Sequence, residues 1–185
     1  MKTIITLALL IIALPLQSQS NRIYSATISG GGFFPIEKLS NSVETGYNLG
    51  IDLETRKSNF ALFGSGKINQ VKANRWNFDS YGMPIMEKWT YSIGEITAGG
   101  RWYLGHPDKL NANLDLGVGI YTGNYFQKIH WGIQPGFGGN VPISKKLSAN
   151  LNVKINVLEA DEWETYAGVY LGLRYSIGNL NKSKN

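Results

Sequence analysis

Residues 110–121 alternate between apolar and polar side chains over their whole length. The even positions are Leu, Ala, Leu, Leu, Val and Ile, and the odd positions are Asn, Asn, Asp, Gly, Gly and Tyr. A period of two places the two sets on opposite faces of a β-strand. The polar face carries Asn and Gly in place of the Lys, Glu and Thr typical of a solvated sheet. We interpret this segment as one wall of a narrow barrel, with the polar face inside and the apolar face toward lipid.

The same period recurs along the chain, and after residue 20 no segment shows a helical period or about 18 unbroken apolar residues. The eight predicted strands are residues 23–34, 43–54, 59–67, 89–104, 110–121, 129–138, 147–157 and 163–177. We therefore predict an all-β chain, an eight-stranded antiparallel up-and-down transmembrane β-barrel. Closure of such a sheet leaves no backbone N–H or C=O group unpaired in hydrocarbon.

Several positions interrupt the alternation. Glycines at residues 30–32 permit a bend or bulge in the first strand. The parity of the fourth strand changes near Gly94, so we predict a bulge there that keeps Ile93 on the outer face. Pro135 has no N–H group to donate, which predicts a second bulge. A turn at residues 55–58 predicts that Gly50 lies opposite Phe63.

The longest predicted connection is residues 68–88, which carries aromatic side chains among polar ones. We regard Trp76, Phe78 and Tyr81 as candidate contacts for an extracellular ligand, since long, aromatic-rich loops usually have a function. With an even number of strands and periplasmic termini, this connection faces the cell exterior.

The first twenty residues have the organisation of a cleavable signal peptide. Lys2 gives the positive start, residues 4–14 are apolar, and small serines follow. An uncleaved anchor is the alternative, but the apolar run is shorter than the about 20 residues that span a bilayer. The predicted organisation is a signal peptide at residues 1–20, the barrel at 21–178 and a polar tail at 179–185.

Composition excludes several classes of function. The chain has 185 residues, no Cys and 17% charged residues, against roughly 25% in an average soluble protein. The absence of Cys excludes disulfides, thiol catalysis and a lipid-modified cysteine. The formal charge is +5, but no basic run with interleaved aromatics accompanies it, so we expect no nucleic-acid partner.

Acidic and basic residues in nearly equal number share the predicted inward face. They are Glu44, Asp52, Glu54, Lys67, Glu95, Arg101, Asp115, Lys154 and Arg174. We interpret them as an ion-pair network that fills an interior too narrow for an open channel. A gated or proton-conducting path is the alternative.

Outward aromatic residues gather near the two predicted rims, where they would meet the lipid interface. They are Phe60, Trp102, Phe137 and Tyr175 near the termini, and Trp89, Tyr91 and Trp131 near the opposite rim. The core of a soluble β-sandwich is the alternative reading of these residues.

Candidate catalytic and metal-binding residues are few. Neither His106 nor His130 has a partner at ligand spacing, so we predict no metal site, no cofactor and no enzymatic activity. His130 near the outer rim keeps a lipid-modifying enzyme open as a lesser alternative. The acidic connection at residues 158–164 lacks the spacing of an EF-hand and is read as a solvated surface.

Four segments resemble the small outer-membrane barrels of the OmpA, OmpX, OmpW and opacity-protein type. They are RWYLG at 101–105, LGVGIY at 116–121, QPGFGGNVPISKKLSANL at 134–151 and YLGLRYSI at 170–177. The last segment is similar to the signal read by the barrel-assembly machinery, with Gly172, Tyr175 and Ile177 at the matching positions. It departs from that signal by ending on Ile177 in place of an aromatic residue and by the residues that follow.

The resemblance implies an integral outer-membrane protein, here expected to be a monomer with periplasmic termini. Its expected partners are outer-membrane lipid, the assembly machinery and an extracellular ligand at residues 68–88. We expect a non-enzymatic structural or surface-contact role. The alternatives are OmpW-like binding or transport of a small apolar molecule, and a soluble lipocalin-like barrel whose apolar face is turned inward.

Overall fold

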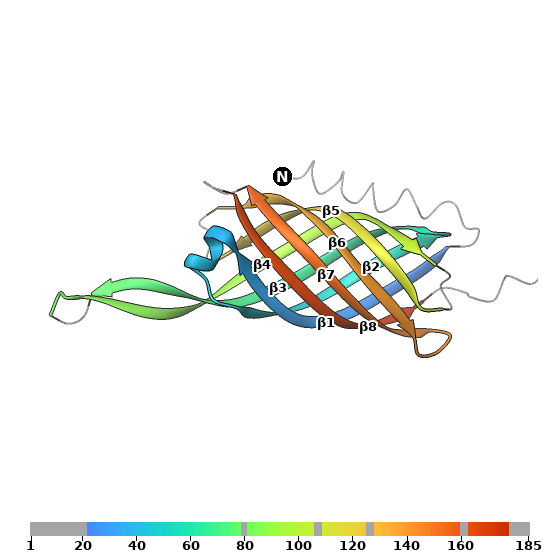
Figure 1. Cartoon of the computed structure of the whole chain (residues 1–185), viewed down its shortest axis with the longest axis horizontal. Coiled ribbons are helices and arrows are strands. Elements are labelled where there is room, and N and C mark those ends of the chain that lie inside the picture. The colour runs from blue at the N-terminus through green and yellow to red at the C-terminus, as the bar shows by residue number, and fades with distance from the viewer. Residues whose placement is uncertain (1–21, 79–80, 106–108, 125–127, 160–162, 178–185) are drawn as a thin grey trace, which may run out of the picture.

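A computed structural model shows the chain as a closed barrel in which eight antiparallel strands follow one another in sequence order (Figure 1). It describes residues 22–78, 81–105, 109–124, 128–159 and 163–177. The strands are β1 (Ile23–Ile36), β2 (Gly46–Lys57), β3 (Phe60–Phe78), β4 (Pro84–Leu104), β5 (Asn111–Gly123), β6 (His130–Pro142), β7 (Leu147–Glu159) and β8 (Glu164–Ser176). The predicted fold class is confirmed. The predicted signal peptide and polar tail lie outside the described residues.

The two faces of the sheet have opposite chemistry. On β5, Leu116 and Val118 are 64% and 63% exposed on the outer face, whereas Asn113 and Asp115 are buried inside. The same division holds around the barrel, because closure turns alternate side chains of every strand inward. A lipocalin-like barrel has apolar side chains inside, so the soluble alternative is wrong. An apolar band of this kind is suited to a hydrocarbon surrounding.

Glycines on the inner face make room for long side chains and for the backbone of neighbouring strands. A Cβ atom at Gly50 would lie 2.5 Å from Cγ of Lys67, and one at Gly31 would lie 1.8 Å from the carbonyl oxygen of Val169. In the register of β2 with β3, Gly50 is paired with Lys67, and Glu54 is paired with Phe63. The predicted pairing of Gly50 with Phe63 is therefore wrong. The turn is shorter than predicted, because β2 continues to Lys57 and Ser58 adopts a left-handed φ of 55°.

No bulge occurs at the positions where the sequence predicted one. The registers of β4 with β3 and with β5 continue without slip through Gly94. Ile93 consequently points inward and is fully buried. Pro135 pairs with Leu116, and the β6–β7 register is the same on both sides of it. Two pairs are missing from the ladder there, as expected where a proline cannot donate.

The predicted long loop at residues 68–88 is wrong, because most of it is a β-hairpin. β3 and β4 remain paired as far as Phe78 and Pro84. The register of β3 with β2 ends at Gln70, and that of β4 with β5 begins at Ile93. Beyond the bridge between Val43 and Ala73 the described hairpin is two-stranded, and Figure 1 shows it projecting well past the other strands.

An apolar cluster closes the barrel at the base of this hairpin. The short 3-10 helix η2 (Glu37–Asn41) supplies Leu39, and the segment after it supplies Val43, which bridges to Ala73. The cluster, here called the apolar cap, consists of Phe33, Leu39, Val43, Val71, Ala73, Ile93, Tyr121, Leu158 and Tyr166.

Among the described residues, no helix is long and apolar enough to cross a membrane.

Candidate functional site

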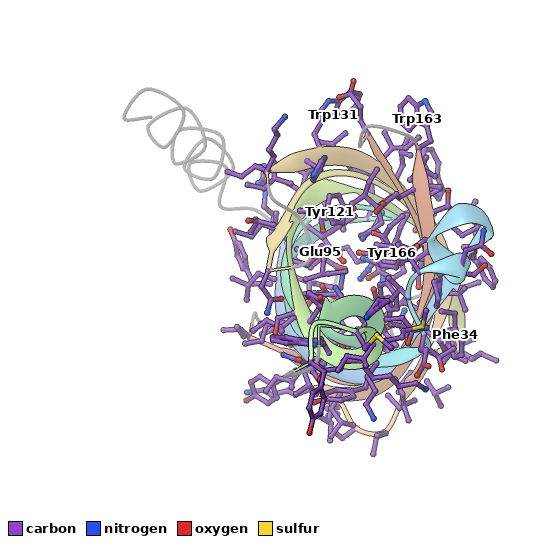
Figure 2. The ribbon with its side chains drawn as sticks, turned by 90° about the vertical axis from the view of Figure 1, so that its left-hand side faces the viewer. Phe34, Glu95, Tyr121, Trp131, Trp163 and Tyr166 are labelled. Atoms are coloured by element: carbon purple, nitrogen blue, oxygen red, sulfur yellow. The ribbon has the colours of Figure 1, made fainter. Side chains whose placement is uncertain are left out.

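The interior next to the apolar cap is built around Glu95 of β4. Its Oε1 accepts hydrogen bonds from Lys67 Nζ and Gln134 Nε2, each at 2.6 Å, and its Oε2 accepts one from the Tyr166 hydroxyl at 2.8 Å. The side chains of Lys67 and Glu95 are 1% and 0% exposed. Figure 2 shows Glu95, Tyr121 and Tyr166 pointing into the lumen. Four strands are thereby tied to one carboxylate.

A second cluster, nearer the chain termini, is built around Arg101. Its Nε and Nη2 donate to the two carboxylate oxygens of Asp115, each at 2.7 Å, and its Nη1 donates to Glu54 at 2.8 Å. Arg174 donates to Glu54 and to the Tyr103 hydroxyl, which itself donates to Glu54. The two-pronged contact of a guanidinium with a carboxylate is the strongest geometry for such a pair.

Lys154 of β7 links the two clusters. Its Nζ donates to Gln134 Oε1 at 3.1 Å and lies 3.8 Å from Asp115 Oδ2. The ammonium group also lies 4.6 Å from the centre of the Phe63 ring. Side chains from opposite walls therefore meet across the middle of the barrel, which leaves a filled interior between the two ends.

Eight of the nine charged residues predicted to face inward are buried in the structure. Glu44 is the exception, and that prediction is wrong. Its side chain is 44% exposed and lies 2.5 Å from Lys88 Nζ at the surface. The regular strand begins only at Gly46, and Val43 turns inward to the apolar cap. The prediction missed Arg56, which is buried, with its Cζ atom 3.8 Å from the centre of the Tyr103 ring. Arg56 could have been found from the sequence, because it continues the alternation that turns Asp52 and Glu54 inward.

The predicted interface aromatics fall into two groups. Near the termini, Phe60, Trp102, Phe137 and Tyr175 are all outward and 47% to 58% exposed. At the opposite rim Trp131 is outward and meets Trp163 edge to face, with ring centres 6.5 Å apart. Figure 2 shows both of these rings on the outside of the barrel.

Trp89 and Tyr91 were assigned to the lipid-facing wall, and that assignment is wrong. The unbroken register places them on the same side of β4 as Ile93. Tyr91 packs against the apolar cap. Trp89 stays 44% exposed, because the hairpin has left the barrel wall at that height.

The predicted loop contacts lie on the projecting hairpin. Trp76 and Phe78 belong to β3, paired with Met86 and Pro84, and the placement of their side chains is outside the described part of the structure. Tyr81 lies in the turn and is 90% exposed.

Of the two histidines considered for catalysis or metal binding, His130 lies within the described residues. Nδ1 of His130 lies 2.8 Å from the carbonyl oxygen of Glu159. Within the described ranges, no group of three or more His, Cys, Asp or Glu residues is arranged to hold a metal ion. His106 and the central part of the acidic connection, residues 160–162, lie outside the described residues.

No protein-family model and no curated protein sequence matches the chain. Several solved structures do match the chain in fold. Neisserial surface protein A matches with a TM-score of 0.59 at 8% identity, over 84% of this chain and 99% of that one. The outer membrane protein OprG from Pseudomonas aeruginosa matches with 0.59 at 12% identity, over 87% and 99%. The outer membrane protein Ail of Yersinia pestis matches with 0.50 at 12% identity, over 85% and 100%.

These likenesses concern the fold, and they cover nearly the whole length of each matched protein. The barrel therefore has the architecture of the small outer-membrane barrels that the sequence resembles.

Proposed function

We propose that the chain is a non-enzymatic integral outer-membrane barrel whose projecting β3–β4 hairpin contacts partners at the cell surface. The apolar outer face supports a membrane position, and the fold shared with outer-membrane proteins supports the outer membrane as that position. The resemblance of residues 170–177 to an assembly-machinery signal, from which they depart at Ile177, supports the same position.

The lengths of the connections support an orientation with periplasmic termini. Ser25 pairs with Ser176, so β1 begins and β8 ends at the same end of the barrel. The two-residue turn after Lys57 lies at this end as well, whereas the long hairpin lies at the other. Outer-membrane barrels have short periplasmic turns and longer extracellular loops, so we place the hairpin outside the cell.

The observation that carries the proposal is the exposure of this hairpin. The outer part of the hairpin, residues 74–88, pairs with no other strand among the described residues, so neither of its edges has a partner strand there. Tyr81, Met83 and Met86 are 90%, 64% and 55% exposed. Free strand edges and exposed apolar side chains are the features through which proteins add a partner strand or bury an interface.

The filled interior favours this role over transport of a small apolar molecule. A passage for such a ligand needs an apolar path, whereas the middle of this barrel is occupied by buried ion pairs and by contacts between opposite walls, such as that of Tyr166 with Glu95.

Shortening the hairpin tests the proposal. Replacing residues 75–87 by an Asn-Gly turn keeps the pairing of Asn74 with Lys88 and suits a two-residue hairpin. We expect bacteria displaying this variant to lose retention on surfaces coated with extracellular-matrix and cell-surface proteins. The pair of changes Tyr81→Ala and Met83→Ala should weaken retention about tenfold, as loss of a tyrosine anchor does at interfaces.

The matched control changes Ile129→Ala and Trp163→Ala, which remove side chains 71% and 58% exposed at the same end of the barrel but outside the hairpin. This control should retain full binding, and all variants should still migrate as folded barrels on unheated gels. Undiminished retention by the shortened, folded chain contradicts the proposal.

A further inference from the structure

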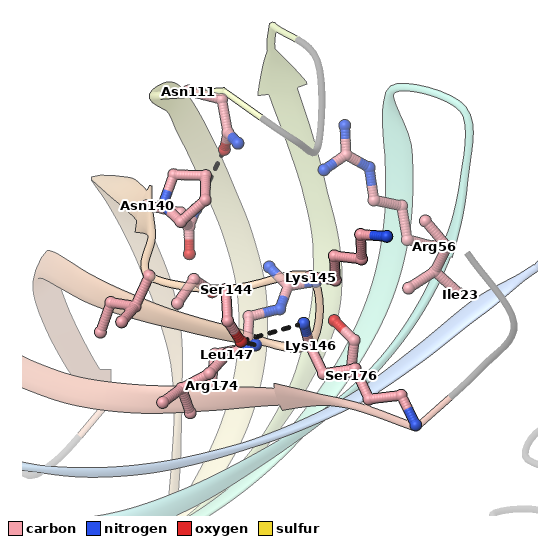
Figure 3. Close-up of a pocket in the computed structure, with 13 residues that line it drawn as sticks. Ile23, Arg56, Asn111, Asn140, Ser144, Lys145, Lys146, Leu147, Arg174 and Ser176 are labelled. Carbon is pink, nitrogen blue, oxygen red and sulfur yellow. Dashed lines mark hydrogen bonds between the residues drawn. The ribbon is translucent and has the colours of Figure 1, made fainter. Parts of the chain in front are cut away.

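A cavity of about 450 Å³ opens at the end of the barrel where β1 begins and β8 ends (Figure 3). Its walls come from the ends of β1, β2, β5, β6, β7 and β8 and from the turn between β6 and β7. The polar clusters and the apolar cap fill the barrel beyond it. Buried side chains therefore lie between this cavity and the opposite end of the barrel.

The walls of the pocket are basic. Arg56 and Arg174 are buried in it, and Lys145 and Lys146 stand exposed on the β6–β7 turn at its edge. The described residues that line it include no Asp or Glu. Among the side chains that the structure describes, five buried ones are basic, Arg56, Lys67, Arg101, Lys154 and Arg174, and four are acidic, Asp52, Glu54, Glu95 and Asp115. Because Arg56 and Arg174 both line the pocket, the positive excess lies at this end.

Hydrogen-bonding capacity remains on these walls. Arg174 uses three donors, to Ser25, Tyr103 and Glu54, of the five that a guanidinium has. Neither Lys145 nor Lys146 forms an ion pair with any part of the chain that the structure describes.

Asn140 adds an acceptor to these donors. Its Nδ2 donates to Asn111 and Asn113, at 3.2 Å each, whereas its Oδ1 is buried without a hydrogen-bond partner. Asn140 is 3% exposed and lines the pocket. A buried acceptor of this kind is costly unless a ligand or water donates to it.

We propose that this pocket binds a phosphate ester that carries hydroxyl groups, of the phosphoglycerol type. Guanidinium and ammonium groups match the phosphate oxygens, Asn140 Oδ1 accepts from a hydroxyl, and the volume exceeds the needs of a lone phosphate ion. The ester is either a soluble molecule or the headgroup of a lipid. That it enters from the periplasm rests on the orientation given under the proposed function.

Binding of glycerol 3-phosphate to the full chain in nanodiscs of zwitterionic phosphatidylcholine tests the pocket, with calorimetry as the readout. We expect saturable binding, and no binding of uncharged glycerol. Changing Lys145→Gln and Lys146→Gln together should weaken affinity about tenfold, the loss of one charge-assisted hydrogen bond or more. Both side chains are exposed on a turn, so the barrel should fold normally.

The matched control is Lys57→Gln with Lys109→Gln, which removes two exposed lysines at the same end but outside the pocket lining. Unchanged affinity in this control supports a specific site. Equal weakening by both pairs, or absence of saturable binding, overturns the proposal.

A second arm uses nanodiscs that contain phosphatidylglycerol. If a lipid headgroup is the natural occupant, glycerol 3-phosphate no longer binds, and native mass spectrometry shows phosphatidylglycerol retained by the unaltered chain but not by the Lys145→Gln, Lys146→Gln variant. If a soluble ester is the occupant, binding persists. Neither outcome depends on the hairpin. A failed adhesion experiment would therefore contradict the proposed function but not the proposal that the pocket binds a phosphate ester.

Discussion

Replacing Lys67 with methionine is expected to lower the free energy of unfolding of the barrel by about 3–5 kcal/mol, the cost of removing one partner of a buried ion pair. Methionine keeps most of the apolar stem but leaves the Glu95 carboxylate, which is 0% exposed, without its cation. Gln134 and Tyr166 still donate to it, yet neither carries a charge. Urea titration of the refolded chain in lipid vesicles measures the loss.

Two controls separate this effect from lost packing. Adding Glu95→Gln to Lys67→Met removes the unpaired buried charge of the carboxylate and should restore most of the free energy of unfolding. The surface change Lys88→Met breaks the exposed pair with Glu44 and should cost less than about 1 kcal/mol. Equal losses for Lys67→Met and Lys88→Met contradict a buried network.

Placing arginine on the outer wall is the second large effect. Leu116 lies midway along β5 and is 64% exposed, so Leu116→Arg places a charge near the middle of the hydrocarbon. The expected cost is about 2–4 kcal/mol, as for charged residues at the bilayer midplane of outer-membrane barrels. The same urea titration in vesicles measures it.

Leu110 is the matched position, since it is 73% exposed and lies just before β5. Leu110→Arg should cost about 0–1 kcal/mol, because the charge reaches the interface. In a barrel surrounded by water, both changes would be nearly neutral. Equal and small losses at the two positions therefore argue against a lipid-facing wall.

Strand number and the facing of most side chains could be predicted because the alternation is strict where the barrel crosses its apolar surroundings. At Leu116 and Asp115 the surroundings change completely from one residue to the next, from an apolar exterior to a polar interior. Such a contrast fixes the register of each face, since a slip by one residue would invert every side chain.

The rim facing the hairpin could not be predicted in the same way. There the interior becomes apolar, so Ile93 lies inside on the same face as Glu95. Alternation distinguishes two faces but does not reveal the height at which the inner one changes from polar to apolar. A bulge at Gly94 was therefore predicted where the strand runs straight. Tyr91 was misplaced for the same reason.

Turns and strand extensions were the other source of error. Residues 68–88 are mixed in polarity because the outer hairpin has no neighbouring strand to define an inside, and they were taken for a loop. At the opposite end, Arg56 was assigned to a turn, although β2 continues to Lys57 and buries it. The basic pocket could not be foreseen, because it depends on where the β6–β7 turn lies in relation to β2 and β8.

The most direct test of the account is whether the chain needs an amphiphile to fold. The chain is diluted from urea into buffer with or without detergent micelles, and its migration on a gel is compared before and after heating. An apolar exterior predicts a folded, heat-modifiable species only when detergent is present. A monomer that folds and stays soluble in buffer alone would contradict the membrane barrel.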